Sequence, residues 1–127
     1  MKAFFDTDVL IWHLCGDNRA LDFLKAMSQK SGIEWWMSAI NRAEIVFFMR
    51  PEENEKTMLF LTRFQTHPVD AAIIDTAADF FKKWNPSHEM DINNAILAAT
   101  VETCGGVLYT LNEKHYPVPS IVVEKAW

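Results

Sequence analysis

The residues best placed for chemistry are polar side chains that follow or interrupt apolar segments. Asp6 follows the apolar residues 3–5 and precedes a second apolar run, residues 9–14, whose spacing is helical. This order predicts a buried strand, an acidic corner and a helix. Because ligands of an open parallel sheet lie beyond the carboxyl ends of its strands, Asp6 is well placed for catalysis or binding. Thr7 or Asp8 could instead serve only as the N-cap of the helix, which explains Asp8 better than Asp6.

Glu44 lies inside an apolar segment, residues 39–48, which is predicted to be a helix that starts after a second strand. A carboxylate among apolar neighbours is costly to bury unless it pairs with a cation or binds a metal. Glu44 is about one and a half turns into this helix, so it is expected near the carboxyl edge of the sheet. A salt bridge, for example with Arg42, is the structural alternative.

Two more segments place polar residues beside apolar ones. Asn94 heads the closely packed run of residues 95–100, and Asp91 lies three residues earlier on the same face of a predicted helix. A simple N-cap is the alternative for Asp91. Thr110 and Asn112 follow a predicted buried strand, again at a carboxyl end.

The elements that must position these residues alternate along the chain. Strand-like apolar runs are residues 3–5, 34–37, 107–109 and 120–123, with the last expected at a sheet edge. Helical periodicity covers residues 9–14, 18–30, 38–49, 52–64, 71–84 and 91–102. Residues 67–69 are expected to form an extended link, and Phe47 and Phe48 to be buried. Strands separated by helices predict a parallel sheet between helical layers.

Composition limits the class of protein. The 127 residues predict a single domain, residues 1–127, and a half-hydrophobic chain with 13% aromatic residues is not disordered. The net charge of −5 argues against binding nucleic acid by bulk attraction, because each neutralised phosphate needs a nearby Lys or Arg. Any contact with nucleic acid must therefore use a local patch or a metal ion.

The cysteines and the first residues bear on the cellular compartment. Cys15 and Cys104 form no Cys-x-x-Cys motif and suit a reducing cytoplasm, although a disulfide between them stays open. The residues before Asp6 do not resemble a signal peptide, and no apolar run approaches the roughly 20 residues of a membrane span. We therefore expect a cytoplasmic protein with no membrane partner.

Four segments, in this order and spacing, resemble the PIN domain in the small form found as the toxin of VapBC toxin–antitoxin pairs. They are residues 4–11, 38–44, 91–100 and 108–112, with Tyr116 beyond. No segment is decisive alone, but together they are fairly specific and cover essentially the whole chain. The resemblance implies a three-layer α/β/α fold with a parallel sheet of about four to five strands flanked by helices. It also implies acids at the carboxyl edge of the sheet that bind Mg²⁺ or Mn²⁺ and cleave RNA.

Carried over position by position, the resemblance assigns the first two acids of the family to Asp6 and Glu44. The third and fourth fall on Asn94 and Asn112, so two carboxylates are replaced by amides. Because Mg²⁺ prefers anionic oxygens, the nearby Asp91 is a candidate replacement. The implied metal ligands are therefore Asp6, Glu44 and Asp91, with Asn94 and Asn112 as further site residues.

The implied chemistry is hydrolysis of RNA by a metal-activated water. The side chains expected to orient water or ligands are Thr7, Asp8, Thr110 and Asn112. The candidate phosphate contacts at the rim are Arg42, Lys114 and His115. The resemblance also implies a homodimer and a small antitoxin whose tail occupies the acidic pocket. Some members of an aromatic excess are expected to face such partners: Trp12, Trp35, Trp36, Phe47, Phe48 and Phe60.

Other functions stay open. Asn94 and Asn112 permit a catalytically weakened PIN domain that binds RNA or protein. Asp6 and Asp8 after a strand also resemble the nucleophile motif of haloacid dehalogenase phosphotransferases, but the acidic pair of that family after a later strand is missing and the chain is short for a cap domain. Receiver domains share the acidic corner but need a Lys directly after a late strand, and Lys114 comes too far past it.

Overall fold

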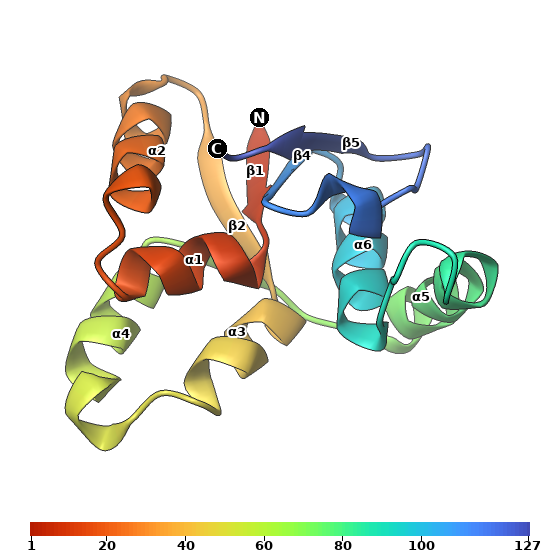
Figure 1. Cartoon of the computed structure of the whole chain (residues 1–127), viewed down its shortest axis with the longest axis horizontal. Helices are drawn as coiled ribbons and strands as arrows, with labels where there is room; N and C mark the ends of the chain where they lie inside the picture. The colour runs from red at the N-terminus through yellow and green to blue at the C-terminus, as the bar shows by residue number, and fades with distance from the viewer.

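The computed structural model describes residues 1–127 and contains five strands and six α-helices (Figure 1). The strands are β1 (Lys2–Phe5), β2 (Glu34–Ser38), β3 (Gln65–His67), β4 (Val107–Thr110) and β5 (Val122–Lys125). The helices are α1 (Thr7–Leu14), α2 (Asn18–Gln29), α3 (Ala39–Val46), α4 (Asn54–Leu61), α5 (Ala71–Trp84) and α6 (Ile92–Cys104). Two 3₁₀ turns, η1 (Pro51–Glu53) and η2 (Glu113–His115), complete the structure.

The sheet has the order β3-β2-β1-β4-β5, and all four strand pairs are parallel. The central strand β1 is apolar throughout its buried part because both of its faces are covered. Successive side chains point to opposite faces, so Phe4 packs into one core while Ala3 and Phe5 pack into the other. All three are 0% exposed. The continuous apolar run that predicted this strand thus reflects a sheet buried on both sides.

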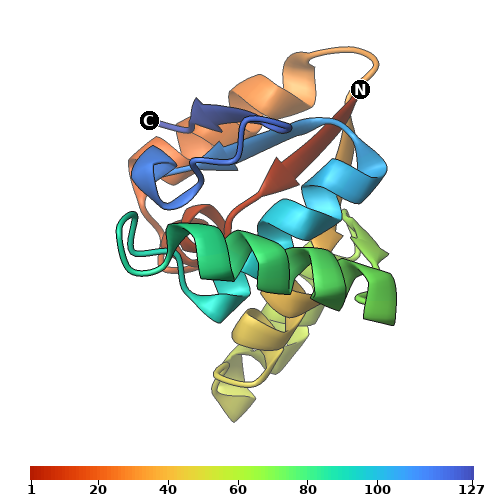
Figure 2. The ribbon, with the colours of Figure 1, turned by 90° about the vertical axis from the view of Figure 1, so that its right-hand side faces the viewer.

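Helices form a layer on each face of the sheet. Figure 1 shows α1 and α2 on one side, and α5 and α6 on the other. Figure 2, turned toward the second side, shows α5 lying across α6. The core between the sheet and α5 and α6 includes Ile73, Leu97 and Leu108, and the core on the opposite face includes Leu10 and Met27. The predicted three-layer α/β/α fold with a parallel sheet is confirmed.

Three carboxyl ends meet at one edge of this sheet. Asp6 follows β1, Ser38 ends β2, and Thr110 ends β4. Ser38 also caps α3 by accepting a hydrogen bond from the Ile40 amide at 3.2 Å. A hydrogen bond of 3.0 Å joins the Thr100 hydroxyl of α6 to the Ser38 hydroxyl, and both side chains are fully buried. This buried bond fixes α6 against the end of β2, where the polar residues converge.

One strand was not predicted and one expectation of burial was wrong. Residues 65–67 form the edge strand β3, and the expected extended link, residues 67–69, shares only His67 with it. This polar segment gains its strand conformation from pairing with β2. Helix α3 ends at Val46, before Met49, so Phe47 and Phe48 lie beyond it. They are 81% and 83% exposed, which contradicts their predicted burial.

Other expectations concern the edge strand, the cysteines and the membrane. β5 is an edge strand as predicted, although it begins at Val122 and extends to Lys125. Cys15 and Cys104 are free thiols, so the structure contains no disulfide between them. None of the helices combines the length and apolar character needed to cross a bilayer.

Candidate active site

Asp6 occupies the N-cap position of α1, but its side chain makes no capping hydrogen bond. Its Oδ2 atom instead accepts hydrogen bonds from the Thr110 hydroxyl at 2.8 Å and the Tyr116 hydroxyl at 2.9 Å. Thr7 and Asp8 lie inside the first turn of the helix, so neither is the N-cap. The Asp6 carboxylate is therefore held by β4 and the segment after η2, with Oδ1 left without a side-chain donor.

Burial makes the Asp6 carboxylate unusually basic. Asp6 is 7% exposed, and loss of solvation raises its pKa to about 6. The hydrogen bonds from Thr110 and Tyr116 lower this pKa in part, whereas the charge of Asp8 raises it. Burial, and then the charge of Asp6, raise the pKa of Tyr116 well above its ordinary value, so Tyr116 stays a neutral donor. No Lys, Arg or His forms a salt bridge with Asp6.

Glu44 is held by neutral donors from two directions. The Thr7 hydroxyl donates to Oε1 at 2.8 Å, and the Asn93 amide donates to Oε2 at 3.3 Å. The Asn41 amide in turn donates to the Thr7 hydroxyl at 2.9 Å, which directs the Thr7 proton toward Glu44. The salt bridge to Arg42 that sequence left open is not formed. Glu44 thus has neutral hydrogen-bond donors and no cationic partner.

Asp91 and Asn94 form a capping box at the start of α6. Asp91 Oδ1 accepts a hydrogen bond from the backbone N–H of Asn94 at 2.7 Å. Asn94 Oδ1 accepts one from the backbone N–H of Asp91 at 3.1 Å. The Asn94 side-chain amide also donates to the Tyr116 hydroxyl at 3.0 Å. Since that amide can only donate, the Tyr116 proton points to Asp6. Asn94 therefore acts on Asp6 through Tyr116.

An acidic cavity of about 140 Å³ collects most of the predicted residues. Its lining consists of Asp6, Thr7, Asp8, Asn41, Glu44, Asp91, Asn93, Asn94, Leu97, His115 and Tyr116. Four carboxylates thus share one cavity with a single imidazole, and no Lys or Arg lines it. Like charges gathered without a counter-charge are unfavourable unless a cation joins them.

Four predicted residues do not line this cavity: Thr110, Asn112, Arg42 and Lys114. Thr110 bonds Asp6 from the end of β4, and the Asn112 amide donates to Asp8 at 3.1 Å. Asn112 and Arg42 are not part of the lining. Lys114 pairs with Glu89 at 3.3 Å, and His115 lies 3.4 Å from the same carboxylate.

The donor chemistry of the cavity fits Mg²⁺ or Mn²⁺. No three acidic, His or Cys side chains converge as a finished set of metal ligands. Mg²⁺ nevertheless keeps several of its waters and commonly takes only one or two carboxylates from a protein. Asp6 and Glu44 provide two such carboxylates, and the Asn93 amide adds a neutral oxygen nearby. The residues present therefore fit a hydrated divalent cation.

Three side chains in the site were not identified as site residues from sequence. Asn41 and Asn93 hold the Thr7–Glu44 pair, and Tyr116 holds Asp6. Asn41 lies three residues after Ser38, a capping-box spacing that could have indicated its position at the start of α3. For Asn93 and Tyr116, only the tertiary structure shows the contact, because their partners are 49 and 110 residues away.

Asp6→Asn is expected to stabilise the metal-free fold at neutral pH. The fold raises the pKa of Asp6 from 3.8 to about 6, so its ionised form costs about 3 kcal/mol at pH 7. Protonation of Asp6 removes this cost, so the free energy of unfolding rises as the pH falls through 6. The gain is complete below about pH 4. The gain from Asp6→Asn should therefore be largest near pH 7.5 and vanish near pH 4, as measured by urea unfolding in EDTA. An equal gain at both pH values, or a loss at pH 7.5, would contradict the buried-charge account.

Comparisons with known proteins agree with this geometry. The PIN domain family model matches residues 3–119. Ribonuclease VapC10 of Mycobacterium tuberculosis (strain CDC 1551 / Oshkosh) is 30% identical over 114 residues, which cover 89% of this chain and 84% of the relative. A toxin–antitoxin complex from Klebsiella pneumoniae has a TM-score of 0.79 at 21% identity, with 98% of both chains covered. VapBC2 from Rickettsia felis, bound to a DNA fragment from its promoter, has a TM-score of 0.82 at 16% identity, covering 100% of this chain and 99% of the other. The chain therefore belongs to the PIN domain family and is a VapC-like member of it.

Proposed function

We propose that the protein is a Mg²⁺- or Mn²⁺-dependent endoribonuclease and the toxin of a type II toxin–antitoxin pair. The observation that carries this proposal is that the buried Asp6 and the half-buried Glu44 line one acidic cavity and neither is paired with a cation. The 30% identity to a ribonuclease named VapC10 supports the same activity. Its substrate would be RNA in the cytoplasm, and the bond cleaved would be a phosphodiester.

The side chains around the cavity divide the work of binding and orientation. A divalent cation held by Asp6 and Glu44 would stabilise charge on the phosphate and supply a nucleophilic water near neutral pH. Thr110 and Tyr116 fix the orientation of Asp6. Thr7 and Asn93 do the same for Glu44.

Residues farther from the two central carboxylates have accessory roles in this proposal. Asp91 and Asp8 would bind the outer waters through their second carboxylate oxygens. His115 lines the cavity, so it can donate to a phosphate oxygen. Arg42 and Lys114 remain candidates for the flanking phosphates, although Lys114 would first have to leave Glu89.

One observation favours a second function, a weakened PIN domain that binds RNA or protein without cutting. Asn94 replaces an expected acid, and its side chain is already used for the capping box and for Tyr116. At the start of α6, Asp91 is then the carboxylate that could complete a set of three with Asp6 and Glu44. The effects of Asp91→Asn and Asn94→Asp on RNA cleavage separate the two functions.

The proposed activity predicts cleavage that depends on an added divalent cation. A mixed RNA pool incubated with purified protein should be cut in Mg²⁺ or Mn²⁺, remain intact in EDTA, and be cut again after excess Mg²⁺ is restored. Denaturing gels of end-labelled RNA measure this directly. Equal cleavage in EDTA would indicate a metal-free mechanism, and no cleavage with either ion would support the binding-module alternative.

We infer that an antitoxin binds an apolar groove that shares the lining residue Glu44 with the acidic cavity. The groove has a volume of about 220 Å³ between α1, α3 and the segment before α4, and its apolar lining is Ile11, Leu14, Cys15, Ile45, Phe48 and Met49. Glu44 lines both the groove and the acidic cavity. Two of the structural neighbours are described as a toxin–antitoxin complex and a VapBC complex. We infer that an apolar antitoxin segment fills the groove and that a following basic side chain reaches Glu44.

A homodimer fits a second apolar surface beside the cavity. Seven apolar residues line a cavity of about 260 Å³ between α5 and α6: Ile74, Ala77, Ala78, Phe81, Ile92, Ala95 and Ile96. Ile92 is 63% exposed although it directly follows Asp91. Such a patch is typical of protein interfaces. We infer that two copies pair through this α5/α6 surface.

The two surfaces predict separable defects. Ile92→Asp should give a monomer by light scattering at micromolar concentration yet keep antitoxin binding, because it places a charge only in the α5/α6 surface. Phe48→Asp should weaken antitoxin binding by about tenfold or more yet leave the dimer intact, since a buried aromatic contact is worth more than 1.4 kcal/mol. Each variant is the control for the other. A parent that is monomeric and binds no adjacent small gene product would contradict both assignments.

A further inference from the structure

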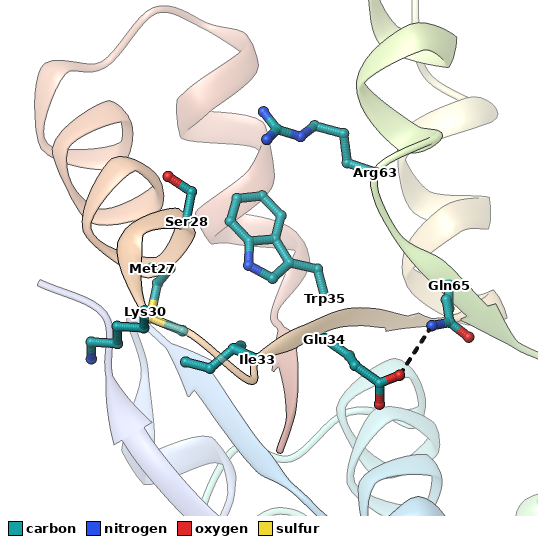
Figure 3. Close-up of a pocket in the computed structure, with 8 residues that line it drawn as sticks. All are labelled: Met27, Ser28, Lys30, Ile33, Glu34, Trp35, Arg63 and Gln65. Carbon is teal, nitrogen blue, oxygen red and sulfur yellow. Dashed lines mark hydrogen bonds between the residues drawn. The ribbon is translucent and has the colours of Figure 1, made fainter.

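A larger cavity lies at the amino ends of the strands, whereas the acidic cavity lies at their carboxyl ends (Figure 3). Its volume is about 350 Å³, against about 140 Å³ for the acidic cavity. It is formed by the end of α2, the start of β2 and the residues before and within β3. Because the strands are parallel, the starts of β2 and β3 lie away from the strand ends that carry Asp6 and Thr110. This cavity, here called the Arg63 pocket, is lined by Met27, Ser28, Lys30, Ile33, Glu34, Trp35, Arg63 and Gln65.

A rigid aromatic side chain and a guanidinium form the centre of the Arg63 pocket. Figure 3 shows Arg63 reaching over the indole of Trp35 from the opposite wall, and its guanidinium carbon lies 5.2 Å from a ring centroid. The indole packs against Phe5 at 5.3 Å and Phe64 at 5.4 Å between ring centroids. Trp35 is thus fixed by the core, and the exposed Arg63 is positioned above it. Planar bases of single-stranded nucleic acids stack on such aromatic and guanidinium planes.

The charges around the pocket are those of an anion site. Arg63 and Lys30 line it, and Lys25 joins Arg63 in a smaller adjoining cavity that shares Ser28 and Trp35. None of these three cations takes part in a salt bridge. The adjoining cavity also contains His13, whose Nδ1 is buried without a hydrogen-bond partner. In a chain of net charge −5, such a group of unpaired cations is a local positive patch.

The one acid in the pocket is already engaged as an acceptor. Glu34 accepts a hydrogen bond from the Gln65 amide at 3.5 Å, as Figure 3 shows. Its side chain lies on the opposite side of β2 from Trp35, because successive residues of a strand point to opposite faces (Figure 3). An acidic peptide would match the cations but would gain nothing from the flat Trp35–Arg63 pair. The chemistry therefore favours a ligand that has both a ring and a phosphate.

We propose that the Arg63 pocket binds one nucleotide of single-stranded RNA at a distance from the scissile bond. The identification of the ligand as RNA rests on the proposed nuclease function, whereas the pocket itself does not. The strands that separate the two edges contain four or five residues, so the edges are about 15 Å apart. A short RNA can therefore occupy both the acidic cavity and the Arg63 pocket. The pocket would supply the local positive patch that this acidic chain needs to hold RNA.

The test measures RNA binding without cleavage. Anisotropy of a fluorescent ten-nucleotide RNA of mixed sequence is followed in EDTA, which withholds the divalent cation. Arg63→Ala should weaken binding about tenfold and lower the slope of log affinity against log salt by about one. Arg63→Lys should restore the salt slope but only part of the affinity, because a lysine keeps the charge and loses the flat stacking surface.

A matched control is available on α5. Lys83 lies 4.8 Å from the Trp84 ring, so Lys83→Ala removes the same kind of cation–aromatic pair from another part of the molecule. It should change the affinity less than twofold. Binding should also quench tryptophan fluorescence in the parent, and this signal should be lost in Trp35→Phe.

Several results would overturn the proposal: no RNA binding by the parent, equal affinities of Arg63→Ala and Lys83→Ala, or equal competition by an acidic peptide of matched charge. Failure of the nuclease function looks different. A parent that binds RNA through Arg63 but does not cut it in Mg²⁺ refutes the nuclease and leaves the pocket intact. A parent that cuts RNA while Arg63→Ala binds normally refutes the pocket and leaves the nuclease.

Discussion

Asp6→Asn should reduce Mg²⁺-dependent RNA cleavage by about a thousandfold or more while the protein stays folded. The asparagine can still accept the hydrogen bonds that Thr110 and Tyr116 donate, so the local structure is preserved. What is lost is the negative charge at the most buried carboxylate of the cavity. A thousandfold loss corresponds to about 4 kcal/mol of barrier, which is within the several kcal/mol that a bound metal contributes. Single-turnover cleavage at saturating Mg²⁺ measures the effect.

The control for this exchange is Asp75→Asn. Asp75 is exposed on α5 and does not line the acidic cavity, so the same loss of charge there should leave cleavage unchanged. Glu44→Gln should behave like Asp6→Asn, because Glu44 is the other carboxylate proposed to hold the cation. Unchanged cleavage in folded Asp6→Asn would remove Asp6 from the catalytic site.

Asp91→Asn should lower cleavage by about 10- to 100-fold without lowering the melting temperature. Aspartate and asparagine are equally good N-caps, so the capping bond to the Asn94 backbone survives the exchange. The charge beside the cavity is lost, and a defect in groups that orient a metal and its waters is typically of this size. Asp91→Ala should show the same loss of activity plus about 1 kcal/mol of lost stability, which is the usual value of an N-cap. Cleavage rates and thermal unfolding of the two variants separate the roles.

Asn94→Asp completes this comparison. In the active-nuclease account the added charge does not raise cleavage, because Asp91 already provides the third one, and loss of the amide that donates to Tyr116 lowers cleavage modestly. If Asp91→Asn cuts RNA as fast as the parent, Asp91 is only a cap. If the parent is inactive and Asn94→Asp gains both Mg²⁺ affinity and cleavage, the natural chain is a weakened PIN domain. Calorimetric titration with Mg²⁺ distinguishes this outcome from a general loss of folding.

The sequence predicted the parts of the site that depend on local order along the chain. A strand, an acid and a helix in succession placed Asp6 at a carboxyl end, and a position about one and a half turns into the helix after β2 placed Glu44 near the same edge. These two positions are confirmed because a parallel sheet brings the ends of its strands to one edge whatever the details of the loops. The roles of both acids as metal ligands stay predictions. The capping alternative for Asp91 is also correct, although it does not exclude the position of Asp91 at the cavity.

The parts that escaped prediction depend on contacts between distant segments. Strand β3 is a short polar edge strand whose hydrogen bonds to β2 have no counterpart in local composition. Phe47 and Phe48 continue the helical periodicity of α3, but that helix ends first and leaves them exposed. The hydrogen bond from Tyr116 to Asp6 joins residues 110 positions apart. Periodicity describes one segment at a time, so it cannot identify such partners.

The most direct test of the account is a crystal of the protein soaked in Mn²⁺, with the ion located by its anomalous scattering. The account predicts one ion in the acidic cavity in contact with carboxylate oxygens of both Asp6 and Glu44, with waters completing its coordination. It also predicts that the ion is lost in Asp6→Asn. An empty cavity at a Mn²⁺ concentration that supports cleavage, or an ion bound elsewhere with Asp6 and Glu44 still held only by their neutral donors, would contradict it.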